Sequence, residues 1–249
     1  AWYRFGKFVR RNRVAVAVAA SAFAVLLAAT IYSLHEAQLA RRQAARADAV
    51  RDFVVGVFEQ TDPDARQGKP ITASELLDMG ARRLANEPAS RPFRTEMQGL
   101  VGHLYWLVGN YSKAQMLMND ANAHPDARTP LDVRARNLLY LAQSEGEKEL
   151  FEAARNHARQ AEKLALGAGS AGTPIASAAR RVYANALTLD GNAKAAEPVL
   201  RDALSDDGIQ FGPRSQAVAD DLTELARATH ELSRYPESIA FSRQAIAKE

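Results

Sequence analysis

The chain has 249 residues, no cysteine and a formal net charge of +3. Without cysteine it cannot build a disulfide framework, a cysteine zinc site or a thiol nucleophile. Residues 1–13 carry a charge of +5, so the other residues sum to −2, and the bulk of the chain lacks the basic surface of a nucleic-acid-binding protein. Alanine, leucine, arginine and glutamate dominate, which predicts an all-α fold.

A run of 21 residues, 14–34, contains no charged side chain. As a helix it would be about 31 Å long, which is enough to cross the hydrocarbon core of a bilayer. A buried core helix of this length would carry a polar stripe, and a signal peptide would have a shorter apolar core followed by a small-residue cleavage site. The run shows neither feature, so we expect one transmembrane helix.

The flanking charges predict how this helix is oriented. Five cations lie within residues 1–13 and three arginines within residues 41–46, a bias that places the N-terminus in the cytoplasm. The basic segment would contact anionic lipid headgroups through residues 4–13. The expected location is therefore the inner membrane of a bacterium, with the larger C-terminal part in the periplasm.

Residues 35–60 are expected to continue as a helical stem. Five apolar residues fall at helical spacing and make one face: Val50, Phe53, Val54, Val57 and Phe58. This face would either form a dimerising coiled coil or dock on the following domain as its first helix, and the short heptad pattern favours docking. The stem should stop at Asp62-Pro63, because proline cannot continue a helix.

A second helix is expected within residues 72–91, ahead of the repeats. Thr72 and Glu75 have the spacing of a capping box, in which each side chain bonds the backbone N–H of the other residue. The helix should run to about Asn86.

From residue 92 onward the sequence repeats. Small residues recur where two helices of one unit must cross closely, and the last of each set falls at 121, 161, 203 and 245, giving periods of 40, 42 and 42 residues. This pattern resembles a long-period tetratricopeptide-repeat array. The resemblance implies an α-solenoid of four helix–turn–helix units, at about 95–128, 135–168, 177–210 and 219–249. Glu145, Thr229, Ser238 and Ser242 depart from the usual residue types.

Several sequence patterns are similar to those of catalytic or ligand-binding sites, but their surroundings in the sequence do not support such a site. The segment "GAGSAG" at 167–172 has nucleotide-loop spacing, but a helical pattern rather than a strand precedes it. The five histidines form no metal-binding pair, and no serine lies in a hydrolase elbow. We therefore predict no catalytic residue, no metal and no cofactor in this chain.

The first helix of each unit lines the concave groove in tetratricopeptide arrays, so the resemblance predicts a groove for a protein or peptide ligand. Arg181 and Asn185 are four residues apart on one helix face, and with Arg227 they would form a cationic clamp for a carboxylate. The alternative is that these are ordinary solvated side chains, and that Trp106 belongs to the core. The candidate groove residues are His103, Trp106, Arg136, Tyr140, Gln143, Arg181, Asn185, Thr188, Arg227 and His230.

The order of parts resembles the C-terminal half of bacterial membrane-bound serine/threonine kinases with a tetratricopeptide ectodomain. The most specific stretches are the basic segment with its span and "FEQTDP…ITASELLD". Kinase motifs are absent here, so the resemblance implies that ATP, Mg²⁺ and phosphoryl transfer belong to residues preceding Ala1. This chain would be the anchor and sensor, signalling through a homodimer.

Two other interpretations stay open. A stand-alone anchored scaffold for envelope proteins would need no kinase, and a soluble co-chaperone would require the predicted span to be wrong. The chain starts at Ala1 and ends within a helical pattern at Glu249, so we expect the natural protein to extend in both directions.

Overall fold

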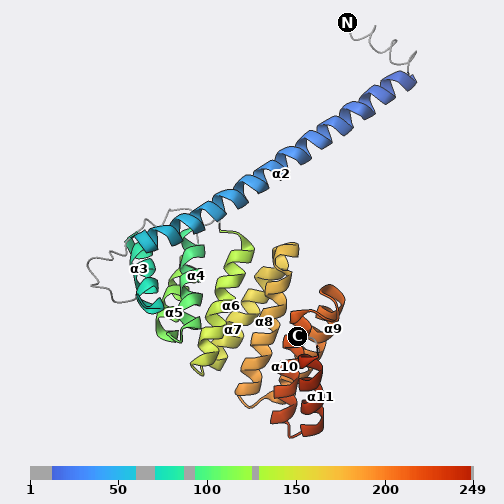
Figure 1. Cartoon of the computed structure of the whole chain (residues 1–249). Helices are drawn as coiled ribbons and strands as arrows, with labels where there is room; N and C mark the ends of the chain where they lie inside the picture. Colours follow the sequence, from blue (N-terminus) through green and yellow to red (C-terminus); the bar gives the residue numbers. More distant parts are fainter. Residues whose placement is uncertain (1–12, 60–70, 87–92, 125–128, 248–249) are drawn as a thin grey trace. The chain divides into compact units, whose positions relative to one another are not determined.

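A computed structural model describes residues 13–59, 71–86, 93–124 and 129–247 (Figure 1). All regular secondary structure in these ranges is helical, as the composition predicts. The chain divides into two compact units, residues 1–53 and residues 54–249. Each unit is described by itself.

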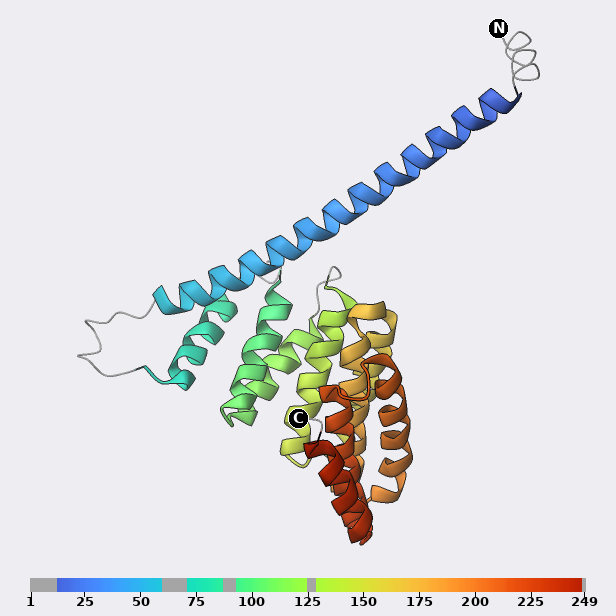
Figure 2. The ribbon, with the colours of Figure 1, turned by 45° about the vertical axis from the view of Figure 1, so that its right-hand side comes forward.

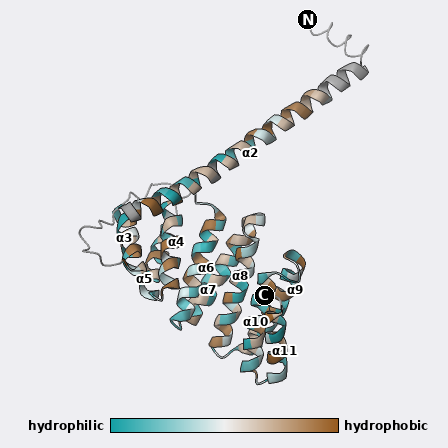
Figure 3. Cartoon of the chain, in the orientation of Figure 1, coloured by the Kyte–Doolittle hydropathy of each residue, from teal (hydrophilic) through white to brown (hydrophobic). Residues whose placement is uncertain are grey.

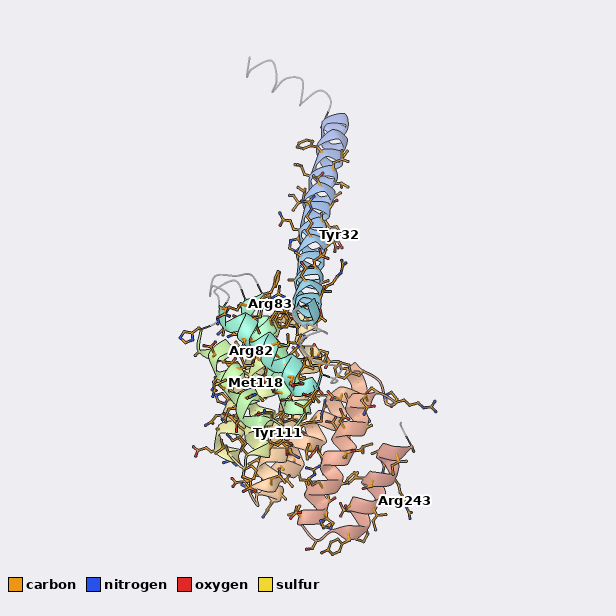
Figure 4. The ribbon with its side chains drawn as sticks, turned by 60° about the vertical axis from the view of Figure 1, so that its left-hand side comes forward. Tyr32, Arg82, Arg83, Tyr111, Met118 and Arg243 are labelled. Carbon is orange, nitrogen blue, oxygen red and sulfur yellow. The ribbon has the colours of Figure 1, made fainter. Side chains whose placement is uncertain are left out.

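The described part of the first unit is a single helix, which is the larger part of α2 (Arg13–Glu59). Its large apolar side chains are exposed, Tyr32 among them (Figure 4). Figure 3 marks the apolar residues of this helix in brown. The exposed set is Phe23, Val25, Leu26, Leu27, Ile31, Tyr32 and Leu34. Within the ranges given above, no helix combines the length and apolar character that crossing a bilayer requires. The side chains of residues 13–20, where the expected span begins, are not among those described, and neither is the basic segment 1–12.

The second unit begins with the last turn of α2, followed by α3 (Ala73–Asn86). Gly56 and Val57 are buried there, and a Cβ on Gly56 would overlap the guanidinium of Arg83 on α3. Val54 is exposed, so only part of the predicted stem face is covered by this unit. The side chain of Phe58 and the Asp62-Pro63 stop fall outside the described residues.

The predicted capping box at the start of α3 is confirmed. The backbone N–H of Thr72 donates to Glu75 Oε2 at 2.8 Å, and the backbone N–H of Glu75 donates to Thr72 Oγ1 at 3.2 Å. Two N–H groups at the helix start thereby gain partners, which fixes where α3 begins.

Four helix pairs follow, and successive helices lie side by side in chain order (Figures 1 and 2). The pairs are α4 (Arg94–Leu107) with α5 (Tyr111–Ala123), α6 (Leu131–Glu147) with α7 (Phe151–Gly167), α8 (Thr173–Leu189) with α9 (Ala193–Gln210), and α10 (Gln216–Glu231) with α11 (Tyr235–Ile246). The predicted solenoid of four units is confirmed. Helices α6 and α8 start about four residues before the expected units, because Pro130 and Pro174 are compatible with a helix start.

Alanine allows the two helices of each pair to pack closely. Ala154, Ala158, Ala161 and Ala165 of α7 are fully buried, and they lie at i, i+4, i+7 and i+11 on one face. The expected small residues at 121, 161, 203 and 245 are all buried. In the first pair, Gly102 lies against the buried Met118 of α5, labelled in Figure 4. The predicted close crossings are therefore confirmed.

Three of the four polar departures from the repeat pattern find partners inside the fold, and the fourth, Ser242, is exposed. Glu145 is 3% exposed and accepts a hydrogen bond at 2.7 Å from His157 Nδ1. Thr229 Oγ1 donates to the Leu225 carbonyl at 2.7 Å, and Ser238 Oγ donates to the Ala226 carbonyl at 2.7 Å. Because the polar groups of Glu145, Thr229 and Ser238 are paired, these residues are compatible with the solenoid.

The "GAGSAG" segment connects α7 to α8 through the short 3₁₀ helix η1 (Gly169–Ala171). Gly169 has φ of 65°, and a Cβ on Gly172 would overlap the carbonyl of Ala165. The glycines therefore serve a tight connection between two helices, as the sequence context predicts.

Candidate functional site: a groove on the first helices

A cavity of about 790 Å³ opens along the first helices of the four pairs. Helices α4, α6, α8 and α10 supply all but one of the residues that line it. Its wall mixes small apolar side chains, two arginines and three carboxylates. The lining residues are Trp106, Ala142, Gln143, Gly146, Glu147, Ala154, Ala178, Arg181, Val182, Asn185, Ala186, Leu189, Asp220, Thr223, Glu224 and Arg227.

The structure brings five of the ten candidate residues to this groove. Trp106, Gln143, Arg181, Asn185 and Arg227 all line it. They come from the four first helices α4, α6, α8 and α10.

The other five candidates do not line the groove. His103 and Tyr140 stack on each other with ring centroids 3.9 Å apart. Thr188 is buried and donates to the Ala184 carbonyl at 3.0 Å. His230 is exposed and meets the edge of Tyr235. Arg136 is half-buried and its charge acts on Tyr140. None of these five side chains lines the cavity, so the expectation that they face the groove needs correction. Ring contacts engage His103, Tyr140 and His230, and Thr188 is buried.

An aromatic stack borders the end of the groove formed by α4 and α6. His103 lies between Tyr140 and Trp106, and its ring centroid is 5.5 Å from that of Trp106. Burial lowers the pKa of His103 and raises the pKa of Tyr140, so both rings favour their neutral forms. Trp106 Nε1 and Gln143 Oε1 are shielded and have no hydrogen-bond partner among the described residues.

Arg181 is the most heavily engaged side chain of the groove. Its Nη1 donates to Ser177 Oγ at 2.6 Å, to Asp207 Oδ2 at 3.0 Å and to Asp221 Oδ1 at 3.2 Å. Asp220 Oδ2 lies 3.6 Å from its Nη2. Asp207 and Asp221 are almost fully buried, so Arg181 serves as their counter-ion. The predicted cationic clamp therefore lacks a free guanidinium at its centre.

The other two members of the predicted clamp meet a carboxylate as well. Asn185 Nδ2 donates to Glu224 Oε2 at 2.7 Å, and Arg227 Nε lies 3.8 Å from the same oxygen. Glu224 thus occupies the position that the sequence analysis assigns to a ligand carboxylate.

Sequence reasoning missed the acidic residues of α10. Asp220, Thr223, Glu224 and Arg227 line the groove at i, i+3, i+4 and i+7, which is the spacing of one helix face. The signal that could have found them is the helical periodicity of "DDLTELAR" at 220–227. Within the described ranges no group of three His, Asp or Glu side chains is placed to hold a metal ion.

Comparison with known proteins identifies the fold. No family model matches the sequence, and neither does any curated protein. Among solved structures, the chain is similar to the nearly identical TPR-like repeats of a putative kinesin light chain from Podosopora anserina, with a TM-score of 0.60 and 15% identity over 80% of this chain and 94% of that one. A variant of the same repeats gives a TM-score of 0.62. BtubC (BKLC) from P. vanneervenii gives 0.55 and 18% identity over 71% of this chain and 70% of that one. The repeat unit is therefore a tetratricopeptide-like α-solenoid.

Proposed function

We propose that the repeat unit is a protein-interaction module whose groove binds a segment of a partner protein. The observation that carries the proposal is the cavity shared by α4, α6, α8 and α10. Stacked helix pairs form extended concave surfaces of this kind, which are commonly used for binding. The groove also holds unpaired polar atoms beside small apolar side chains, a combination that suits a peptide backbone.

Blocking the groove tests this proposal. Peptides selected from a random display library against the wild-type chain should lose binding to Thr223→Trp, because Thr223 is exposed and lines the cavity. The matched control is Ser205→Trp, an exposed position on α9 that does not line the cavity. If peptide binding is lost in both Thr223→Trp and Ser205→Trp, or in neither of them, binding in the groove is contradicted.

For the whole chain we propose a membrane-anchored sensor module of a serine/threonine kinase whose catalytic domain is a separate segment. The support is the basic cluster ahead of the apolar run 14–34, the exposed apolar side chains of α2, and the resemblance of the ordered parts. Ligand binding in the periplasm would act through dimerisation or a change in dimer geometry, because one helix alone transmits a conformational change poorly. An anchored envelope scaffold is the alternative.

Membrane fractionation tests the anchor. The chain should sediment with inner membranes, and deletion of residues 14–34 should release it. Alkaline phosphatase fused after Glu249 should be active, since that enzyme requires the periplasm. A chain that stays soluble with 14–34 intact contradicts the anchor, and coding sequence upstream of Ala1 without kinase motifs contradicts the kinase and favours the scaffold.

A further inference from the structure

The charges of the groove point to the chemistry of its ligand, an inference that rests on the proposed peptide-binding function. The charged side chains on its wall are the carboxylates of Glu147, Asp220 and Glu224 and the guanidiniums of Arg181 and Arg227. Negative groups outnumber positive ones at the surface that a ligand would touch.

Neither arginine is free to attract an acidic ligand. Arg181 is bound by the buried Asp207 and Asp221, which lie behind the wall and do not line the cavity. Its side chain is 14% exposed. Arg227 is more exposed but lies beside Glu224. Three carboxylates on the wall face two guanidiniums that already lie beside carboxylates, so an incoming carboxylate would meet net repulsion.

One groove carboxylate has no positive partner in the described part of the chain. Glu147 lies at the exposed end of α6, and no described cation pairs with it. The side chain of Asp220 is 43% exposed, and its Oδ2 lies 3.6 Å from Nη2 of Arg181, whose Nη1 already donates to Asp207 and Asp221. Both are therefore open to a cation supplied by a ligand.

The end of the groove formed by α4 and α6, where Glu147 lies, also offers an aromatic ring to the same ligand. Trp106 is half-buried in the aromatic stack, and tryptophan is the strongest aromatic partner for a guanidinium or ammonium group. Its unpaired Nε1–H is a donor, and the unpaired Gln143 Oε1 on the neighbouring first helix is an acceptor. A peptide backbone offers the complementary carbonyl and N–H; both protein atoms are shielded in this structure, so pairing with a peptide would require the two side chains to rotate.

We propose that the groove binds an extended peptide segment carrying arginine or lysine side chains, with its basic groups at Trp106 and the carboxylate of Glu147 at one end and at the carboxylates of Asp220 and Glu224 at the other. Four neighbouring first helices, spaced by about 9 Å, span roughly eight residues of extended chain. The proposed ligand is therefore positively charged, whereas Arg181 and Arg227 considered alone predict a negatively charged one.

Three matched peptides test the charge. Each is labelled with fluorescein, has blocked termini and about eight residues, and they differ only in carrying arginine, glutamine or glutamate at the same positions. Fluorescence anisotropy should give the tightest binding for the arginine peptide and the weakest for the glutamate peptide.

Glu147→Gln combined with Glu224→Gln should weaken arginine-peptide binding by about tenfold. Asp202→Asn, an exposed change on α9, should leave it unchanged.

Tryptophan emission locates the peptide. Trp2→Phe leaves Trp106 as the sole tryptophan, so unlabelled arginine peptide should shift its emission at the concentrations that saturate anisotropy. Equal or tighter binding of the glutamine or glutamate peptide, with the same emission shift, overturns the cationic specificity but keeps the groove as a peptide site. Binding of none of the three peptides overturns the cationic ligand and also counts against the proposed function.

Discussion

At the scale of single residues, Arg181 shows how a side chain on the right face can have a different role from the expected one. Its contacts reach Asp207 on α9 and Asp221 on α10. A buried carboxylate without its counter-ion is costly. Arg181 therefore stabilises the packing of α8, α9 and α10. Reversing its charge would impair folding, so a loss of binding in that variant would not test the predicted clamp.

Replacing Arg181 by methionine should lower the free energy of unfolding by about 3–5 kcal/mol, because Asp207 and Asp221 lose their counter-ion. Urea denaturation followed by circular dichroism measures this. Adding Asp207→Asn and Asp221→Asn should restore a large part of the loss. Arg227→Met, at a more exposed position, should change stability by less than about 0.5 kcal/mol. Equal effects of the two arginine variants would rule out the assigned role.

Asp221 should make stability depend on pH. Burial raises its pKa to about 7, against the attraction of Arg181, whereas an unfolded aspartate titrates near 3.9. Between these values the folded state holds a proton that the unfolded state has released, so stability should fall as pH rises from about 4 to 7 and then level off.

Asp221→Asn lacks this titration. As pH rises from about 5 to 8, the free energy of unfolding of the wild type should fall relative to that of Asp221→Asn by on the order of 1–3 kcal/mol. Thermal melts of both proteins across that range measure the difference. A constant difference at every pH would show that Asp221 is ionised throughout.

At the scale of helices, glycine sets how closely the first and second units approach. A Cβ on Gly99 of α4 would lie 1.8 Å from Asn137 Oδ1 on α6, and Asn137 is buried with its Nδ2 donating to the Thr95 carbonyl at 3.0 Å. The Asn137 side chain cannot move aside without breaking that hydrogen bond. Gly146 of α6, in contrast, has open space around it.

Gly99→Ala should destabilise the protein by about 1–3 kcal/mol through overpacking. Gly146→Ala should stabilise it by about 0.5–1 kcal/mol, since alanine is the better helix former and meets no neighbour. Chemical denaturation of this matched pair should give shifts of opposite sign. Shifts of the same sign would contradict the assigned packing.

Asp78 joins α3 to the first pair. Its Oδ1 accepts from Tyr105 Oη at 2.5 Å and from Lys113 Nζ, and these hydrogen bonds, that of Lys113 first, hold its pKa below the usual value. Asp78→Ala should cost about 1–3 kcal/mol at pH 7, partly because the buried Tyr105 hydroxyl loses its partner.

The sign of the shift also sets a pH dependence for Asp78. A depressed carboxyl pKa contributes stability that is present above about pH 4 and is lost as pH falls through the folded value. The difference between wild type and Asp78→Ala should therefore narrow below about pH 4. A gap that widens in acid would be incompatible with this contact.

At the scale of the whole molecule, periodicity was enough to predict the solenoid but not the charge of its groove. Alanines at a 40–42-residue period require close helix pairs, so Ala161 and Ala203 could be placed from sequence alone. The ion pairs of Arg181 could not, since Asp221 lies 40 residues away and comes into contact only through the stacking of units. The stacking of His103 on Tyr140 depends on the same unit-to-unit geometry.

The central claim is that the first helices form the binding surface, and hydrogen–deuterium exchange with mass spectrometry tests it most directly. With saturating arginine peptide, amide exchange should slow in α6, α8 and α10, whose residues line the groove. Exchange in α9 and α11 should change little, apart from amides stabilised through the whole fold. Protection concentrated on α9 and α11, or no protection despite measured binding, would contradict the account.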